Sequence, residues 1–202
     1  MALWLQDFET VDEVIVHLNT KNDVPDISNY KSFPAICKLV IEHQCHNIVE
    51  LHSPHSRLGC ALACAFDDVN ITSICKEHTH ALDHHNLTCI QDWSSNIVDT
   101  IADASLDLVF IHDHDLPEDE LYGTLRDWLK KIKPGGILSG PHFGLECDHM
   151  SRRSYCLYEF ARTENLTIDS AGPHASAFVC INTPSESETT LRPIRMQDFS
   201  DE

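Results

Sequence analysis

Four polar residues in the order His-Asp-His-Asp, from His112 to Asp115, directly follow a short apolar run, and His142 follows a second one. Imidazole nitrogens and carboxylate oxygens together form a ligand set for zinc or a transition metal. In an extended segment His112 and His114 share one side while Asp113 and Asp115 share the other. We therefore predict a metal site made by His112, Asp113, Asp115 and His142, with a hydrated polar rim as the alternative interpretation.

The residues around this polar segment predict a β-α-β unit. Leu106 to Ile111 is a nearly continuous apolar run, which is typical of a strand buried on both faces of a parallel sheet. Apolar residues at helical spacing follow between Pro117 and Lys133, and Pro134 to Gly136 predict a turn before a strand that begins at Ile137. Ligands bind outside the carboxyl ends of strands in open α/β sheets, so the polar segment lies where chemistry is expected.

The same alternation extends along the chain. We predict an N-terminal helical cap and first helix in residues 1–46, then strands at 47–51, 70–75 and 87–90, helices at 58–66, 82–86 and 96–102, and finally a helix at 151–163 and closing strands at 166–170 and 175–181. This order predicts one α/β domain over residues 1–182, with a mainly parallel sheet, helices on both faces and an antiparallel closing strand. Residues 183–202 are predicted to be a flexible acidic tail.

Charge and composition narrow the classes of partner. The 202-residue chain has a formal net charge of −18, which repels nucleic-acid backbones and anionic membranes and favours a small molecule or a protein. No apolar run approaches the roughly 20 residues of a membrane span, and the acidic N-terminus lacks the pattern of a signal peptide. We therefore expect a cytoplasmic protein whose nine cysteines are reduced and mostly buried.

Histidine is unusually abundant, with 14 copies, so a structural zinc site is a further alternative. Cys75, His78, His84 or His85, and Cys89 supply nitrogen and sulfur ligands. Their spacing matches no standard zinc finger or knuckle. A solvated, histidine-rich loop and helix is the favoured interpretation of this region.

Residues Val49 to Ala63, Ile90 to Trp93 and Ser105 to Phe143 together resemble the class I S-adenosylmethionine-dependent methyltransferases, in particular the type 24 group of small-molecule and sugar O-methyltransferases. The resemblance implies a Rossmann-like α/β fold, S-adenosylmethionine as cofactor and methyl transfer to a small hydroxylated molecule. The third segment is one residue longer than usual, so either His112 or Asp113 takes its first acidic position.

The resemblance also implies a cofactor site at the ends of the first three strands. Glu50 matches the acidic residue that ends the family's first strand, while His52 and Ser56 stand in its glycine loop. Cys75 takes the place of the carboxylate that holds the ribose, and Asp92 matches the acidic residue near the adenine. The implied cofactor-binding set is Glu50, His52, Ser53, Ser56, Gly59, Cys75, Asp92, Trp93 and His112.

Methyl transfer needs little from the protein beyond alignment and removal of the acceptor's proton, because the sulfonium carries its own leaving group. Histidine suits the base role near neutral pH. We expect His114 or His142 to be the base, oriented by Asp113 or Asp115, with a divalent metal as a further expectation. The oligomeric state is left open between a monomer and a homo-oligomer.

The replaced glycines and Cys75 favour a different function, a catalytically degenerate methyltransferase fold that acts as a binding or scaffold domain. The His52 side chain distinguishes the two. An imidazole that fills the cofactor crevice favours the binding domain, whereas one that swings out of an open crevice favours the enzyme. A metal-binding module is the third alternative, although the histidine clusters are dispersed over several predicted elements.

Overall fold

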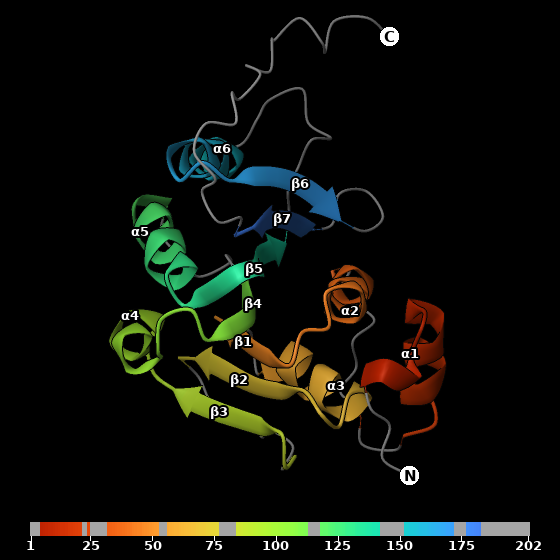
Figure 1. Ribbon diagram of the computed structural model, residues 1–202. Coiled ribbons are helices and arrows are strands. Elements are labelled where there is room, and N and C mark those ends of the chain that lie inside the picture. The colour runs from red at the N-terminus through yellow and green to blue at the C-terminus, as the bar shows by residue number, and fades with distance from the viewer. Residues whose placement is uncertain are drawn as a thin grey trace, which may run out of the picture.

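The computed structural model describes residues 5–21, 24, 32–52, 56–76, 84–112, 118–141, 152–171 and 177–182. Within these ranges, seven strands form one sheet in the order β3-β2-β1-β4-β5-β7-β6 (Figure 1). The strands are β1 (Asn47–Leu51), β2 (Asn70–Cys75), β3 (Leu87–Gln91), β4 (Leu106–Ile111), β5 (Ile132–Pro141), β6 (Thr167–Ala171) and β7 (Ala177–Ile181). The predicted tail at 183–202 lies outside the described residues.

The sheet is parallel except at one strand. β1 pairs with β2 and β4, β2 with β3, and β4 with β5, all in parallel. β7 lies between β5 and β6 and runs antiparallel to both. The predicted mainly parallel sheet with an antiparallel closing strand is therefore confirmed. Every residue of the central strand β4 is buried, as its continuous apolar run predicts.

Helices cover both faces of the sheet, with α1, α2 and α3 on one side and α4 and α5 on the other (Figure 1). The helical segments are η1 (Leu5–Asp7), α1 (Val11–Leu18), α2 (Phe33–Glu42), α3 (Arg57–Ala65), α4 (Ser94–Ile97), η3 (Val98–Thr100), α5 (Glu118–Leu129) and α6 (Arg152–Thr163). Helix α1 begins with a capping box, in which the Thr10 and Glu13 side chains each accept a hydrogen bond from the other's backbone N–H. None of the helices in the described ranges has the length and apolar character needed to cross a membrane.

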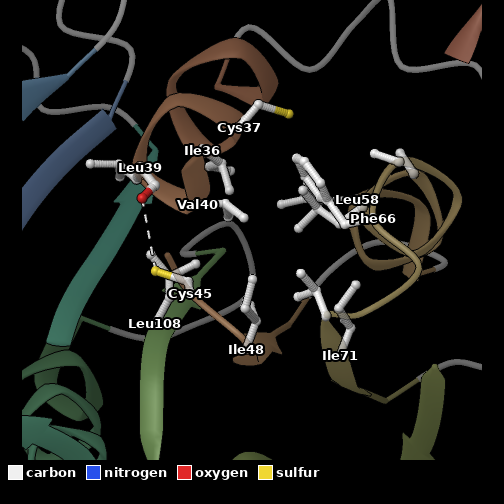
Figure 2. Packing of buried hydrophobic residues seen from close by; sticks show 14 of the residues in the cluster. Ile36, Cys37, Leu39, Val40, Cys45, Ile48, Leu58, Phe66, Ile71 and Leu108 are labelled. Carbon is white, nitrogen blue, oxygen red and sulfur yellow. Dashed lines mark hydrogen bonds between the residues drawn. The ribbon is translucent and has the colours of Figure 1, made fainter. Parts of the chain in front are cut away.

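Two apolar clusters fill the space between the helices and the sheet. Figure 2 shows the one on the α1–α3 side, where residues of α2 and α3 meet the strands; its labelled members include Ile36, Val40, Leu58, Phe66, Ile48, Ile71 and Leu108. Cys45 lies at its edge and its thiol donates to the Leu39 carbonyl, with 3.8 Å between Sγ and the oxygen. The second cluster joins α5 and α6 to the other face through residues such as Trp128 and Phe160.

The predicted turn at Pro134 to Gly136 is wrong, because these residues belong to β5. The helix α5 ends at Leu129 and β5 already begins at Ile132. The register between β4 and β5 shifts between Leu106 and Leu108, which makes room for the extra residues. Gly135 has a φ of 83°, a left-handed conformation that glycine adopts without steric cost.

Two helix predictions also need correction. Of the helix predicted at 82–86, residues 84–86 are described, and they form coil and a turn instead. The Asn86 side-chain amide holds this turn by donating to the carbonyls of Phe66 (2.7 Å) and Val69 (2.9 Å). The helix predicted at 96–102 begins earlier, at Ser94, and is divided into α4 and η3.

Candidate functional site

The Glu50 carboxylate lies at the carboxyl end of β1 and is fully buried. Its Oε2 accepts hydrogen bonds from the Gly59 backbone N–H at 3.0 Å and from Ser73 Oγ at 2.8 Å. Its Oε1 lies 2.9 Å from Nε2 of His112, which also is buried. An ionised carboxylate only accepts hydrogen bonds, so the contact with ionised Glu50 assigns the ring proton to Nε2. One side chain thus joins β1 to α3, β2 and the end of β4.

Gly59 is required by this arrangement. A Cβ atom at this position would lie 2.7 Å from Glu50 Oε2 and 3.3 Å from the Ser73 Cβ. Helix α3 is otherwise rich in alanine and cysteine, and it therefore lies close to the sheet. Gly59 belongs to the site predicted from the sequence, and its contact is with the protein's own carboxylate.

His52 follows β1 and fills the space between that strand and α4. Its φ is 58°, and its backbone N–H donates to the Ile74 carbonyl at 2.8 Å. The imidazole is buried, with 5% of the residue exposed, and Nε2 lies 2.9 Å from Oγ of Ser94. Ser94 begins α4, at the end to which the β2 and β3 arrows point (Figure 1). Because β2 lies between β1 and β3, this contact spans the carboxyl end of β2.

Ser56 and Cys75 make a second contact at this edge. Ser56 has a φ of 52° and stands immediately before α3, and its Oγ lies 3.4 Å from the Cys75 thiol. Both residues are buried. His52 and Ser56 thus both have a left-handed backbone conformation in this loop. Glycines normally supply that conformation. The nearby Cys89 thiol has its pKa raised, mainly by burial.

Asp92 and Trp93 follow β3. Asp92 Oδ1 accepts from the Trp93 backbone N–H and from the Asn96 side chain, both at 2.7 Å, so this carboxylate holds the start of α4. The Trp93 side chain remains 46% exposed. Above its ring lies the Lys76 ammonium, 3.5 Å from the ring centroid, which is a cation–π contact.

The structure brings most of the predicted cofactor-binding residues to one edge of the sheet. Glu50, Gly59 and His112 form one connected group there, and Ser56 contacts Cys75, whose carbonyl accepts from the Asp92 backbone N–H at 3.1 Å. Ser53 and the predicted catalytic residues Asp113, His114, Asp115 and His142 lie outside the described residues, and their roles stay predictions.

The metal predictions are similarly limited. Of the predicted metal set only His112 is described, and it contacts Glu50. Across the described ranges, no group of three or more His, Cys, Asp or Glu side chains is arranged to hold a metal ion, and Cys75, His84 and Cys89 of the zinc alternative lie within those ranges. Within those ranges no disulfide joins the cysteines.

Three residues of this edge were missed by sequence reasoning: Ser73, Lys76 and Ser94. Ser73 supplies a hydroxyl to Glu50, Ser94 holds the His52 imidazole, and Lys76 covers Trp93. Serine is common in strands and loops, so neither serine carried a signal. Lys76 did carry a signal in the sequence, because a cation directly follows the strand end at which a carboxylate was expected.

Solved structures of other proteins share this architecture, whereas no protein-family model and no curated protein matches the sequence. A Staphylococcus aureus protein described as a caffeoyl-CoA O-methyltransferase superposes with a TM-score of 0.62 at 11% identity, over 85% of this chain and 98% of that one. The O-methyltransferase TomG from Streptomyces achromogenes, solved with S-adenosylmethionine, gives 0.55 at 16% identity, over 88% and 91%.

A third structure, the O-methyltransferase from Bacillus cereus in complex with S-adenosylhomocysteine, has a TM-score of 0.54 at 12% identity and covers 87% of this chain and 91% of its own. Identities this low show a common fold and carry no activity from one protein to the other. The strand order, the antiparallel β7 and these superpositions agree: the chain has the Rossmann-like fold of the class I S-adenosylmethionine-dependent methyltransferases.

Proposed function

We propose that this chain is a catalytically degenerate methyltransferase-fold domain, which binds a ligand other than S-adenosylmethionine at the carboxyl edge of its sheet. The observation that carries the proposal is the buried His52 imidazole and its hydrogen bond to Ser94. In the enzymes that the sequence resembles, the backbone at this position approaches the cofactor closely, and a side chain there takes the space that the approach needs.

The contacts around His52 make that obstruction costly to remove. The imidazole is held by Ser94 while its own backbone N–H is bonded to Ile74, so the start of the loop is fixed at two points. Moving the ring would break a buried hydrogen bond, and the Ser94 hydroxyl would have to find another partner. The space between the end of β1 and the start of α4 is thus occupied by the protein's own side chain.

Two further residues support the proposal. The Glu50 carboxylate already accepts from Gly59, Ser73 and His112 and is fully buried, so it is committed to the protein's own groups. At the end of β2, Cys75 offers a thiol, a weak acceptor that already contacts Ser56, in place of a ribose-binding carboxylate. Both residues would therefore hold S-adenosylmethionine less tightly than a free carboxylate would.

O-methyl transfer to a small hydroxylated molecule is the second candidate. The left-handed φ values of His52 (58°) and Ser56 (52°) favour it, because the loop backbone keeps the conformation of a glycine loop. In that case His114 or His142 would act as the base, with Asp113 or Asp115 orienting it, with or without a divalent metal.

Calorimetric titration with S-adenosylhomocysteine and S-adenosylmethionine separates the two candidates. We expect no saturable heat with the natural chain and binding near one per chain with His52→Gly, which keeps the φ and removes the ring. His43→Gly is the matched control, since His43 is exposed at the end of α2, and it should behave like the natural chain.

Saturable binding of either compound near one per chain by the natural protein, checked for folding by circular dichroism, would overturn the proposal in favour of the enzyme. If folded His52→Gly fails to bind as well, His52 is not the obstacle and the argument from its side chain is lost. Each titration is repeated with added divalent metal, because the predicted metal set stays untested.

A further inference from the structure

The ends of β2 and β3 present an exposed aromatic ring and a cation side by side. Lys76 directly follows β2 and Trp93 follows β3. Backbone contacts fix both segments, since Asp92 N–H donates to the Cys75 carbonyl at 3.1 Å and the Gln91 side chain donates to the Lys76 carbonyl at 3.1 Å. The two side chains therefore belong to one rigid edge of the sheet.

Lys76 is held at this edge by the aromatic ring. Its ammonium lies 3.5 Å from the Trp93 ring centroid, and the residue is half-buried. Among the ion pairs found within the described ranges, none includes Lys76. In a chain with a net charge of −18, this is a positive charge that follows a strand's carboxyl end, where open α/β sheets bind ligands.

The charge at the end of the second strand selects the kind of ribose that such a sheet binds. A carboxylate there accepts hydrogen bonds from free ribose hydroxyls, whereas a basic side chain accommodates a phosphate on the ribose. Here the strand ends in Cys75, a buried thiol that contacts Ser56, and the next residue is Lys76. Arg57 starts α3 directly after Ser56 and adds a second exposed cation near this edge.

We infer that the edge formed by Lys76 and Trp93 binds a nucleotide whose ribose carries a phosphate group. The ammonium of Lys76 pairs with the phosphate, and Trp93, 46% exposed, provides an aromatic surface for the base. This site lies beside the His52–Ser94 contact, which stays intact. The inference rests on the proposed function, because it names the class of ligand that replaces S-adenosylmethionine.

The test is calorimetric titration of the full chain at one fixed low ionic strength with four probes: adenosine 2′,5′-bisphosphate, adenosine 3′,5′-bisphosphate, adenosine 5′-monophosphate and S-adenosylhomocysteine. We expect one of the bisphosphates to bind about tenfold more tightly than the monophosphate, the size of one charge-assisted contact. The two bisphosphates distinguish which ribose hydroxyl carries the phosphate.

Lys76→Gln should abolish this preference, while Lys38→Gln, which removes the same charge from the exposed face of α2, should retain it. Equal affinity for the mono- and bisphosphates in the natural chain would overturn the inference, as would a preference that survives Lys76→Gln. The S-adenosylhomocysteine titration reports on the proposed function alone, so each of the two ideas can fail without the other.

Discussion

Two buried carboxylates lie on neighbouring strands, one at the edge formed by the strands' amino ends and one at the edge formed by their carboxyl ends. The two carboxylates bind different partners. Asp107, near the start of β4, accepts from the backbone N–H groups of His46 (3.0 Å) and Asn47 (2.8 Å) and forms an ion pair with Lys133. Glu50, at the end of β1, accepts from Gly59, Ser73 and His112. Asp107 pairs with a half-exposed cation, whereas the partners of Glu50 are all buried.

The difference separates an edge whose carboxylate keeps a link to water from an edge whose carboxylate is closed off from it. At the amino edge Asp107 fastens the start of β1 to β4, and the Lys133 side chain keeps contact with water, being 42% exposed. At the carboxyl edge Glu50 has no such outlet and depends entirely on internal donors. A carboxylate removed from water is stable only while its partners are complete.

The largest effect is expected from Glu50→Ala. This change leaves the Gly59 N–H, the Ser73 hydroxyl and the His112 imidazole without their shared acceptor. The free energy of unfolding should fall by about 3 kcal/mol or more, because each buried donor left unsatisfied costs about 1–3 kcal/mol. Urea unfolding followed by circular dichroism measures it. Glu42→Ala is the matched control, because that carboxylate is exposed and pairs with the exposed Lys38, so its change should stay below about 0.5 kcal/mol. Equal losses in the two variants would contradict the role given to Glu50.

Asp107→Ala should have a smaller effect, about 1–3 kcal/mol by the same measurement. Two backbone N–H groups lose their acceptor, but Lys133 can return to water because it is already partly exposed. A loss as large as that of Glu50→Ala would show that the two carboxylates contribute equally to the free energy of unfolding, despite their different partners.

The smallest effect is expected from chemical labelling of thiols in the natural chain. Burial raises the pKa of Cys45, near the amino edge, to about 12, with Asp107 adding to the effect, so almost none of it is thiolate at pH 8. Cys89, in β3, is less buried, although its pKa is raised too. We expect iodoacetamide at pH 8 to label Cys89 well before Cys45, as followed by peptide mass spectrometry. Faster labelling of Cys45 would mean that the amino edge opens more readily than the middle of β3.

Most of the fold could be predicted because short, largely apolar segments bounded by polar residues recur along the chain, the clearest being β4. The predicted bounds of β1 and β2 match the structure, since a polar residue directly follows each of these segments. The error at Pro134 to Gly136 has a tertiary cause: two glycines and a proline normally end an element, but here the register shift against β4 keeps them in β5.

The candidate site was predictable only in part. Glu50, Cys75 and Asp92 could be placed because the family resemblance assigns each of them to a strand end, and strand ends meet at one edge. The partner of His52 could not, because Ser94 is far away in sequence and no local pattern marks a serine that will receive an imidazole. Which side chain fills a crevice depends on packing between distant segments, and sequence periodicity does not report it.

The close approach of Gly59 to Glu50 constrains the order in which the chain can acquire substitutions. A methyl group at Gly59 would lie 2.7 Å from the Glu50 carboxylate, which three donors hold in place. Alanine at this position is therefore most harmful while Glu50 remains, and a shorter residue at position 50 would leave the 3.3 Å approach to the Ser73 Cβ as its closest contact. The two positions form an epistatic pair, in which the harmful or harmless character of one mutation is decided by the other residue.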